Sequence, residues 1–256
     1  MKPAKRLSIA IPSSLVADTA DQKIRTYKIG QIARACAIHR VDEIVIYRAE
    51  RDESKFIEKV LEYMETPQYL RKYLFPLIPE LKSIGVVPPL QTPHHPTEKT
   101  RYRDGYTLSE DMVDVGYEKP VRLKQKVKKG RRITIDMEKL KIIDKSEVPH
   151  YWGYEVRIED SLSSLLKSSD YKIATSRFGD EKIPRGINAP RLMLIFGSPY
   201  MGIHEILEQE KSEKKPDEWW NAIPAQGTKT VRTEEAVLIT LGIVNSIRRQ
   251  IYGKKT

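Results

Sequence analysis

The stretches Leu7-Ser8-Ile9-Ala10-Ile11 and Glu43-Ile44-Val45-Ile46-Tyr47 are short apolar runs, and they decide the fold class of this chain. Between them, residues 27–39 carry apolar side chains at the three- and four-residue spacing of a helix. A strand, a helix and a second strand in this order are typical of a βαβ unit, whose two strands pair in parallel. The sequence therefore predicts an α/β fold for the first part of the chain.

The same pattern returns in the last third of the chain. Residues 171–175 and 191–196 are predicted buried strands, each followed by a turn that contains glycine. Thr233 is predicted to cap a final helix, since a threonine hydroxyl accepts from the first helical N–H groups. One face of that helix is apolar, and its members are Val237, Leu241, Val244, Ile247 and Ile251.

A different pattern separates these two parts. Four prolines within residues 86–96 predict a rigid linker. Beyond it, the short alternating pieces 117–124, 131–135 and 153–158 are typical of strands. We expect residues 93–168 to form a small β-barrel, inserted into an α/β domain made of residues 1–92 and 169–256.

The composition excludes several classes of protein. The chain has 256 residues, of which 39% are hydrophobic and 31% charged, as in soluble globular proteins. Cys36 is the only cysteine, so neither an intramolecular disulfide nor a cysteine-rich metal site can form. The five histidines show no ligand spacing, and the apolar runs are too short to span a membrane. We expect a cytoplasmic protein with no metal and no membrane partner.

Basic residues are concentrated in one segment. Lysine and arginine total 45 against 35 acidic residues, and residues 119–132 hold eight basic residues and no acidic one. Such a segment is either a solvated face or a contact for a polyanion, and the lack of compensating acids favours the polyanion. Its basic residues are Lys119, Arg122, Lys124, Lys126, Lys128, Lys129, Arg131 and Arg132.

The common nucleotide and hydrolase motifs are absent from the sequence. Residues 197–202 lack the second glycine of the dinucleotide-binding motif, and residues 253–256 lack the upstream glycine of a P-loop. What remains is three loops rich in glycine, proline, asparagine and glutamine, at residues 175–179, 196–202 and 221–236. Each follows a predicted strand, and ligands bind beyond the carboxyl ends of such strands. The loops are either ordinary turns or the walls of one ligand pocket.

Three segments carry a resemblance to a known family. They are residues 28–35 with 40–44, residues 196–199 with Gly202, and residues 221–236, of which the last is the most specific. Together they resemble the SPOUT superfamily of S-adenosylmethionine-dependent RNA methyltransferases, and in particular its archaeal and eukaryotic group with an inserted barrel similar to the oligonucleotide-binding fold. Residues 231–236 are also similar to a stretch of bacterial small-subunit rRNA uridine-N3 methyltransferases.

The resemblance implies an α/β domain with a trefoil knot, a homodimer, and methylation of a uridine N3 in ribosomal RNA with S-adenosylmethionine as the cofactor. Two alternatives stay open: a catalytically silent RNA-binding or ribosome assembly factor with the same fold, and a tRNA-directed methyltransferase.

The resemblance also implies residue roles. Apolar residues would line the adenine slot, glycines would let the backbone approach the cofactor, and polar residues would contact its ribose and methionine parts. The cofactor-binding residues predicted in this way are Thr175, Phe196, Gly197, Gly202, Asn221, Ile223, Pro224, Gln226, Gly227, Val231 and Thr233.

Catalysis at N3 requires removal of a proton or stabilisation of the resulting anion. The predicted catalytic residues are Arg232 for the anion or a phosphate, Glu234 as a base or a contact to the substrate edge, and Arg25. Glu234 has the alternative role of an acid in the first turn of a helix.

RNA phosphates would be bound by Arg25 and by a set of basic residues, although solvated surface charge is the usual fate of such side chains. The predicted RNA-binding residues are Lys28, Arg122, Lys124, Lys126, Lys128, Lys129, Arg131 and Arg132. Aromatic residues of the predicted barrel, either stacked on bases or packed in its core, are Tyr102, Tyr106, Tyr117, Tyr151, Trp152 and Tyr154.

Overall fold

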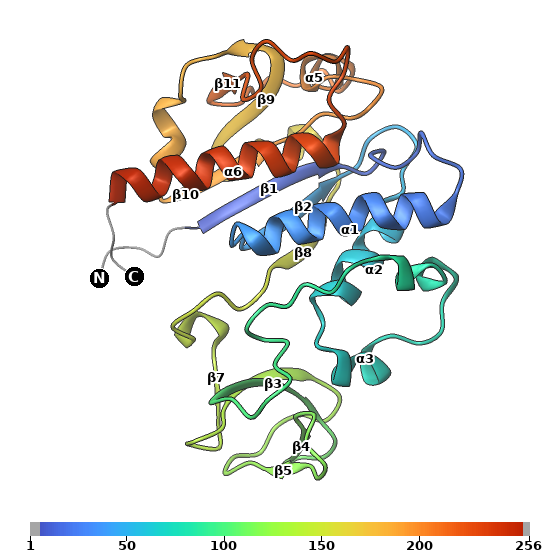
Figure 1. Ribbon diagram of the computed structural model, residues 1–256, viewed down its shortest axis with the longest axis vertical. Coiled ribbons are helices and arrows are strands. Elements are labelled where there is room, and N and C mark those ends of the chain that lie inside the picture. The colour runs from blue at the N-terminus through green and yellow to red at the C-terminus, as the bar shows by residue number, and fades with distance from the viewer. Residues whose placement is uncertain (1–5, 253–256) are drawn as a thin grey trace. The chain divides into compact units, whose positions relative to one another are not determined.

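The computed structural model describes residues 6–252, and the chain divides into two compact units (Figure 1). Within the described residues, the first unit comprises residues 6–62, 83–88 and 154–252, and the second comprises residues 63–82 and 89–153. Each unit is built on one sheet. We call them the parallel-sheet unit and the antiparallel-sheet unit.

The parallel-sheet unit has six strands in the order β11-β9-β10-β1-β2-β8, and all of these strands pair in parallel. Their bounds are β1 Arg6–Pro12, β2 Glu43–Tyr47, β8 Glu155–Glu159, β9 Tyr171–Asp180, β10 Arg191–Ile195 and β11 Glu218–Trp220. In the central strand, Ile9 lies between Ile44 of β2 and Leu194 of β10. The prediction of an α/β fold with a parallel βαβ unit is therefore confirmed.

Helices lie between these strands in the chain, and a further helix follows the last strand. Their bounds are α1 Gln22–Ile38, α2 Ser54–Glu65, α4 Leu162–Leu165, α5 Ile203–Gln209 and α6 Thr233–Tyr252, with short 3-10 turns at Ile84–Val86 and Arg185–Asn188. Helix α1 begins earlier than predicted, because the Asp21 carboxylate caps it by accepting from the Lys23 backbone N–H at 2.7 Å. Figure 1 shows α1 beside α6, and the two helices are in contact.

Helix α6 has the apolar face that the sequence predicts. Val237, Leu241 and Val244 are fully buried and Ile247 is half-buried, whereas the side chain of Ile251 lies outside the described residues. The helix begins at Thr233, so the predicted boundary is also confirmed.

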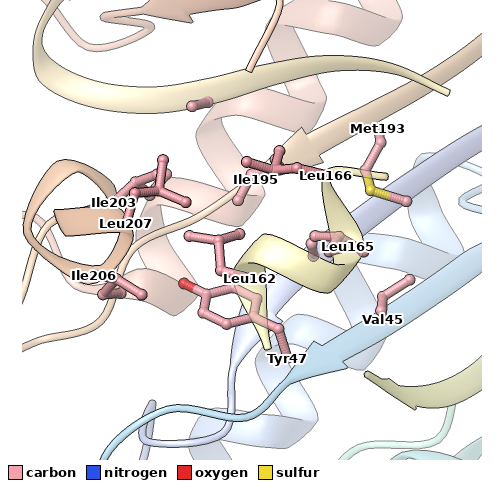
Figure 2. Packing of buried hydrophobic residues seen from close by; sticks show 12 residues of the cluster. Val45, Tyr47, Leu162, Leu165, Leu166, Met193, Ile195, Ile203, Ile206 and Leu207 are labelled. Carbon is pink, nitrogen blue, oxygen red and sulfur yellow. The ribbon is translucent and has the colours of Figure 1, made fainter. Parts of the chain in front are cut away.

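The core on one side of the parallel sheet supports the carboxyl ends of the strands. Figure 2 shows Tyr47 and Ile195 on the strands facing the side chains of the short helices α4 and α5. The Tyr47 hydroxyl donates to the Phe196 carbonyl at 2.6 Å, which satisfies a polar group inside this apolar cluster. Each buried large aliphatic side chain contributes about 1.5 to 3 kcal/mol by leaving water. The cluster comprises Ala10, Val45, Tyr47, Leu162, Leu165, Leu166, Ala174, Met193, Ile195, Ile203, Ile206 and Leu207.

The antiparallel-sheet unit contains five strands in the order β5-β4-β3-β6-β7. The bounds of its elements are α3 Gln68–Leu74, β3 Tyr102–Thr107, β4 Met112–Asp114, β5 Val121–Arg122, β6 Arg132–Asp136 and β7 Lys141–Ile143, with 3-10 turns at Pro79–Leu81 and Lys145–Glu147. Its apolar core is small, with Val113, Val115, Leu123 and Ile135 buried. A separate small β unit is thus present, in the form of a five-stranded antiparallel sheet.

One strand expected in this small unit belongs to the other sheet. Residues 153–158 are predicted above as a barrel strand, but β8 pairs with β2 in parallel and forms an edge of the six-stranded sheet. Period-two alternation describes a half-buried strand in either kind of sheet, so it does not identify the partner. The boundary between the two units falls after Gly153. The φ of Gly153 is 84°, a left-handed conformation suited to glycine.

Two aromatic residues considered for base stacking are core residues of their units. Trp152 is buried and donates from Nε1 to Asp104 Oδ1 at 2.9 Å. Tyr154 is buried and its hydroxyl donates to the Leu61 carbonyl at 3.0 Å. Their hydrogen bonds fix both rings inside the protein.

The single cysteine lies deep in the parallel-sheet unit. Cys36 on α1 is fully buried, and burial raises the pKa of its thiol far above the ordinary value. Among residues 6–252, no cluster of histidine, cysteine, aspartate or glutamate is arranged to hold a metal ion. No helix in the same described part is long and apolar enough to cross a membrane.

Candidate cofactor pocket and RNA-contacting residues

The three predicted loops converge on one pocket beyond the carboxyl ends of β9, β10 and β11. Its volume is about 400 Å³, within the range of small-molecule sites. The strands end at this edge because they are parallel, so the loops that leave them meet there. The lining residues are 175–178, 196–205, 220–223, 226, 229–231, 233, 236 and 240.

Nine of the eleven predicted cofactor residues line this pocket, and Pro224 and Gly227 do not. Phe196 is buried at the pocket wall, and the half-buried Ile223 and Val231 add apolar surface. These three side chains come from loops far apart in the sequence. The structure therefore brings together the apolar residues predicted for an adenine slot.

The predicted polar residues fix the shape of the loops. Thr175 donates from Oγ1 to the Ile195 carbonyl at 2.9 Å. Asn221 donates from Nδ2 to the Arg177 carbonyl at 3.1 Å and accepts from the Ile223 N–H at 3.1 Å. Gln226 donates to the Thr228 carbonyl at 2.9 Å. Their side chains hold neighbouring backbone in place, which leaves the pocket pre-shaped for a ligand.

At two glycines of the pocket wall, the surrounding protein atoms leave enough room for a side chain. A Cβ added at Gly197 would lie 3.4 Å from the Met201 carbonyl oxygen, and one at Gly202 would lie 3.5 Å from Glu205 Oε2. Both are ordinary contact distances. The added carbon would instead occupy pocket space, as expected where backbone must approach a ligand closely.

Thr233 has a different role from the predicted helix cap. It is the first residue of α6, and its Oγ1 donates to the Gly197 carbonyl at 3.2 Å. The cap is supplied by Glu235, which accepts from the Arg232 backbone N–H at 2.9 Å. The hydroxyl of Thr233 thus ties the start of α6 to the 196–202 loop.

The predicted catalytic residues Arg232 and Glu234 lie beside the pocket but do not line it. Arg232 is exposed and Glu234 is half-buried, while their neighbours Val231 and Thr233 line the wall. Glu234 stands in the first turn of α6, where a carboxylate is favoured by the helix dipole.

Arg25 and Lys28, predicted to bind RNA phosphates, are engaged inside the parallel-sheet unit. Arg25 pairs with Glu53 at 2.5 Å, and its guanidinium lies 4.6 Å from the Phe56 ring centroid. Lys28 is buried and its ammonium donates to both carboxylate oxygens of Asp18 at 2.9 and 3.0 Å. Contact with RNA would require each cation to exchange these partners.

Arg132 is the centre of a buried ion network in the antiparallel-sheet unit. Its guanidinium pairs with Glu65 and with Asp104, each at 2.5 Å, and Asp104 also accepts from Thr134 at 2.9 Å. Burial raises the pKa of Glu65, but Arg132 and His94 oppose it and lower that pKa to about 2. The half-buried Arg132 thus neutralises two carboxylates, and contact with RNA would require it to exchange these partners.

The other basic residues of this segment are exposed. Arg122 pairs with Asp111 at 3.2 Å and Lys126 with Glu110 at 3.0 Å, both at the surface. Within the described residues 6–252, no ion pair involves the remaining five, which are Lys119, Lys124, Lys128, Lys129 and Arg131. Contact of this segment with RNA stays a prediction.

The three loops are predictable from the sequence, but several pocket residues are not. Arg177, Phe178 and Tyr200 line the pocket and are exposed. An aromatic residue that follows a strand is usually predicted as core, and only its place in a glycine-containing loop indicates otherwise.

The parallel sheet and its loop-lined edge define an α/β protein with a ligand pocket of the size used for small cofactors. Residues 6–244 match the model of the family described as "Putative RNA methyltransferase", and the chain belongs to this family. The predicted class, an RNA methyltransferase enzyme, is thereby confirmed.

Named relatives are similar over most of the chain. The human "28S rRNA (uridine-N(3))-methyltransferase" is 31% identical over 92% of this chain and 76% of the relative. The Drosophila melanogaster protein of the same name is 32% identical over 92% of this chain, which spans only 61% of that relative's length. A solved structure titled "Structural insights into the 2-OH methylation of C/U34 on tRNA" aligns with 12% identity and a TM-score of 0.42 over 99% of this chain and 95% of that one, a similarity too low to define the fold.

Proposed function

We propose that this protein transfers a methyl group from S-adenosylmethionine to N3 of a uridine in ribosomal RNA. The observation that carries the proposal is the convergence of the three loops on one pocket in a chain of this family. The choice of uridine N3 and of ribosomal RNA is supported by the names of the human and fly relatives.

The residues of the pocket fit S-adenosylmethionine. Phe196, Ile223 and Val231 provide an apolar surface for the adenine, and Gly197 and Gly202 expose backbone for the polar parts of the cofactor. Glu205 in the wall has the charge to complement a cation. When bound, S-adenosylmethionine supplies a methyl group on a positively charged sulfur.

The protein has two tasks in this reaction: to align the uridine with the methyl group and to handle the N3 proton. We assign the proton, or the substrate edge, to Glu234, and the developing anion or a neighbouring phosphate to Arg232. Arg232 lies between the lining residues Val231 and Thr233, and Glu234 follows Thr233, so small movements at the start of α6 would bring both to the pocket mouth.

Glu234→Gln tests this assignment. We expect turnover to fall at least 10-fold while affinity for S-adenosylhomocysteine is unchanged, because the substitution removes a base without altering shape. Glu235→Gln is the matched control, since it removes an equal charge from the same helical turn. Equal turnover in the two variants would show that Glu234 is not the base and serves only as an acid in the first turn of the helix.

We further propose that the chain has the trefoil knot of the SPOUT superfamily, that the antiparallel-sheet unit is an RNA-binding barrel, and that two copies form a homodimer. The bond from Thr233 to Gly197 supports a C-terminal segment held against the 196–202 loop. Exposed apolar residues on the adjacent helices α1 and α6 support the dimer, and these are Ile24, Tyr27, Leu238 and Ile239. In such a dimer, Arg25 would serve the partner's pocket.

Calorimetric titration with S-adenosylmethionine and S-adenosylhomocysteine tests the proposed function first. We expect saturable binding near one ligand per chain, followed by 3-methyluridine in nucleosides from ribosomal RNA incubated with the protein. Absence of binding, repeated with RNA present, would favour a silent RNA-binding factor. Methylation of tRNA but not of ribosomal RNA would identify tRNA as the substrate.

A further inference from the structure

Two exposed aromatic rings lie on the rim of the cofactor pocket. Phe178, near the end of β9, is 79% exposed, and Tyr200, in the loop after β10, is 47% exposed. Both residues line the pocket. An arginine lies over each ring: Arg177 is 4.5 Å from the Phe178 centroid and Arg51 is 4.7 Å from the Tyr200 centroid. We call these two pairs the aromatic rim.

The backbone that carries Phe178 is firmly held although its ring faces solvent. A Cβ at Gly179 would lie 2.6 Å from the backbone of Trp220, so β9 passes too close to β11 for any side chain at this position. Next to it, the Asn221 N–H donates to the Asp180 carbonyl at 2.8 Å. The ring is therefore presented from a fixed strand.

The loop that carries Tyr200 is also ordered by its own hydrogen bonds. The Ser198 hydroxyl accepts from the backbone N–H groups of Tyr200 at 3.1 Å and of Met201 at 3.0 Å. The Ser198 N–H donates to the Met201 carbonyl at 3.0 Å. Such a closed turn keeps the exposed ring at the pocket edge without burying it.

Single exposed aromatic residues are common and need no explanation. Two rings on one pocket rim, each with a guanidinium alongside, are a more specific arrangement. Aromatic rings stack on unpaired bases, and arginines bind the phosphates that flank them. Lys229 in the same lining adds a further positive charge.

The chemistry of uridine N3 requires an unpaired target. In a base pair, N3 lies on the hydrogen-bonded edge, so it is shielded from any methyl donor until the pair opens. An enzyme that acts there needs a surface that replaces the stacking lost when the nucleotide leaves its neighbours.

We propose that Phe178 and Tyr200 stack on unpaired bases of the RNA segment that carries the target uridine, while Arg177 and Arg51 bind the flanking phosphates. This inference rests on the proposed function, because it takes RNA as the substrate of the pocket. It makes the aromatic rim, and not only the basic segment of the antiparallel-sheet unit, a determinant of RNA affinity.

The test is binding of a fluorescently labelled 12-nucleotide oligouridine, measured by anisotropy with S-adenosylhomocysteine present. Phe178→Ala and Tyr200→Ala should each weaken binding about 5- to 150-fold, the range for loss of one base–aromatic stack. Phe178→Trp and Tyr200→Phe should retain affinity, because stacking requires a ring and not the particular side chain. Ile183→Ala removes an exposed apolar residue outside the pocket lining and is the matched control.

Methylation of ribosomal RNA provides the second readout. The alanine variants should raise KM for RNA by a larger factor than they lower kcat or weaken S-adenosylhomocysteine binding. Unchanged oligouridine affinity in both alanine variants would overturn the inference. The inference would also be overturned if the alanine variants no longer self-associated but bound RNA as tightly as the wild type, since the rim would then be a protein interface.

Failure of the proposed function is distinguishable from failure of the inference. If the wild type binds oligouridine through both rings but does not bind S-adenosylhomocysteine, the methyltransferase proposal fails and the rim remains an RNA contact. If the wild type binds S-adenosylhomocysteine and methylates RNA while both alanine variants match it, the rim proposal alone fails.

Discussion

The two units bury their polar groups in different ways. The parallel-sheet unit has an apolar cluster of twelve residues and keeps its polar loops at one edge, around the pocket. The antiparallel-sheet unit has a smaller apolar cluster, in which four residues are buried, and adds the buried carboxylates of Glu65 and Asp104 with the half-buried Arg132. A small domain buries less apolar surface, so such a network takes part of the structural role of a core.

This difference shows why a run of basic residues does not have one function. Arg131 is exposed, whereas Arg132 at the next position is bonded to Glu65 and Asp104. Arg131 directly precedes β6 and Arg132 is its first residue, and successive residues of an extended chain point to opposite sides, so the two arginines meet different surroundings. The predictions below test this contrast between interior and surface charge, and between the two units.

The largest effect is expected from Arg132→Leu. The substitution leaves the carboxylates of Glu65 and Asp104 buried without their cation, which costs about 3 to 5 kcal/mol of unfolding free energy. Arg131→Leu, the adjacent control, should change it by less than about 0.5 kcal/mol. Hydrogen exchange during urea unfolding measures the unfolding free energy of the antiparallel-sheet unit in both variants. Similar losses in the two variants would show that the network contributes little.

The next effect concerns acid stability. Burial and the neighbouring His94 lower the pKa of His95 to about 4. The unfolded chain takes up the proton near pH 6.5, so the folded state loses stability as pH falls from 6.5 to 4, by roughly 2 to 3 kcal/mol. Glu65, whose pKa is lowered to about 2, adds a loss between pH 4.5 and 2.

His95→Gln should remove the first of these two losses. The amide can still donate to the Glu65 carbonyl, which accepts from His95 Nε2 at 2.6 Å, but it does not titrate. Unfolding free energies at pH 7 and pH 4.5, with exposed His150→Gln as the control, measure the difference. An unchanged pH slope in His95→Gln would mean that another group causes the acid loss.

Gly197→Leu tests the pocket of the parallel-sheet unit. Because a Cβ there meets no protein atom closer than 3.4 Å, we expect a stable protein. The side chain would occupy pocket space and weaken S-adenosylhomocysteine binding about 10- to 100-fold. Exposed Gly85→Leu is the control, since nothing lies within 4 Å of its Cβ position. Calorimetric affinity that is equal in both variants would place the cofactor elsewhere.

The smallest effect per residue is expected at the exposed basic segment. Replacing Lys124, Lys128, Lys129 and Arg131 with alanine should reduce the slope of log affinity against log salt by about 3 for single-stranded RNA. Arg122→Ala with Lys126→Ala should change it less per charge, because both cations already pair with acids. Filter binding across a salt series measures the slopes. An unchanged slope in the fourfold variant would remove this segment from the RNA path.

The parallel sheet and the three loops were predictable because their signals are local. Apolar runs such as residues 7–11 and 43–47 are fully buried strands, and chain direction alone brings their following loops to one edge. The wall residues Phe196, Ile223 and Val231 follow from that placement together with the family resemblance.

Pairing between distant residues was not predictable from local pattern. Arg132 and Glu65 are 67 positions apart, and β8 joins β2 from 112 positions away. The Asp18 partner of Lys28 lies in a loop whose path the sequence does not specify. Gly227 belongs to a predicted pocket loop but is not among the residues that line the pocket. Each of these outcomes depends on tertiary contacts that periodicity does not encode.

The burial of Cys36 has a practical consequence. A fully enclosed thiol with a raised pKa does not react with maleimides or nitroxide reagents under native conditions. Cysteines introduced at exposed positions, such as Ile183→Cys in the parallel-sheet unit and Lys129→Cys in the basic segment, would therefore be the only labelled sites. Distances between spin labels at these two positions would report the spacing of the two units in solution, with the native sequence otherwise intact.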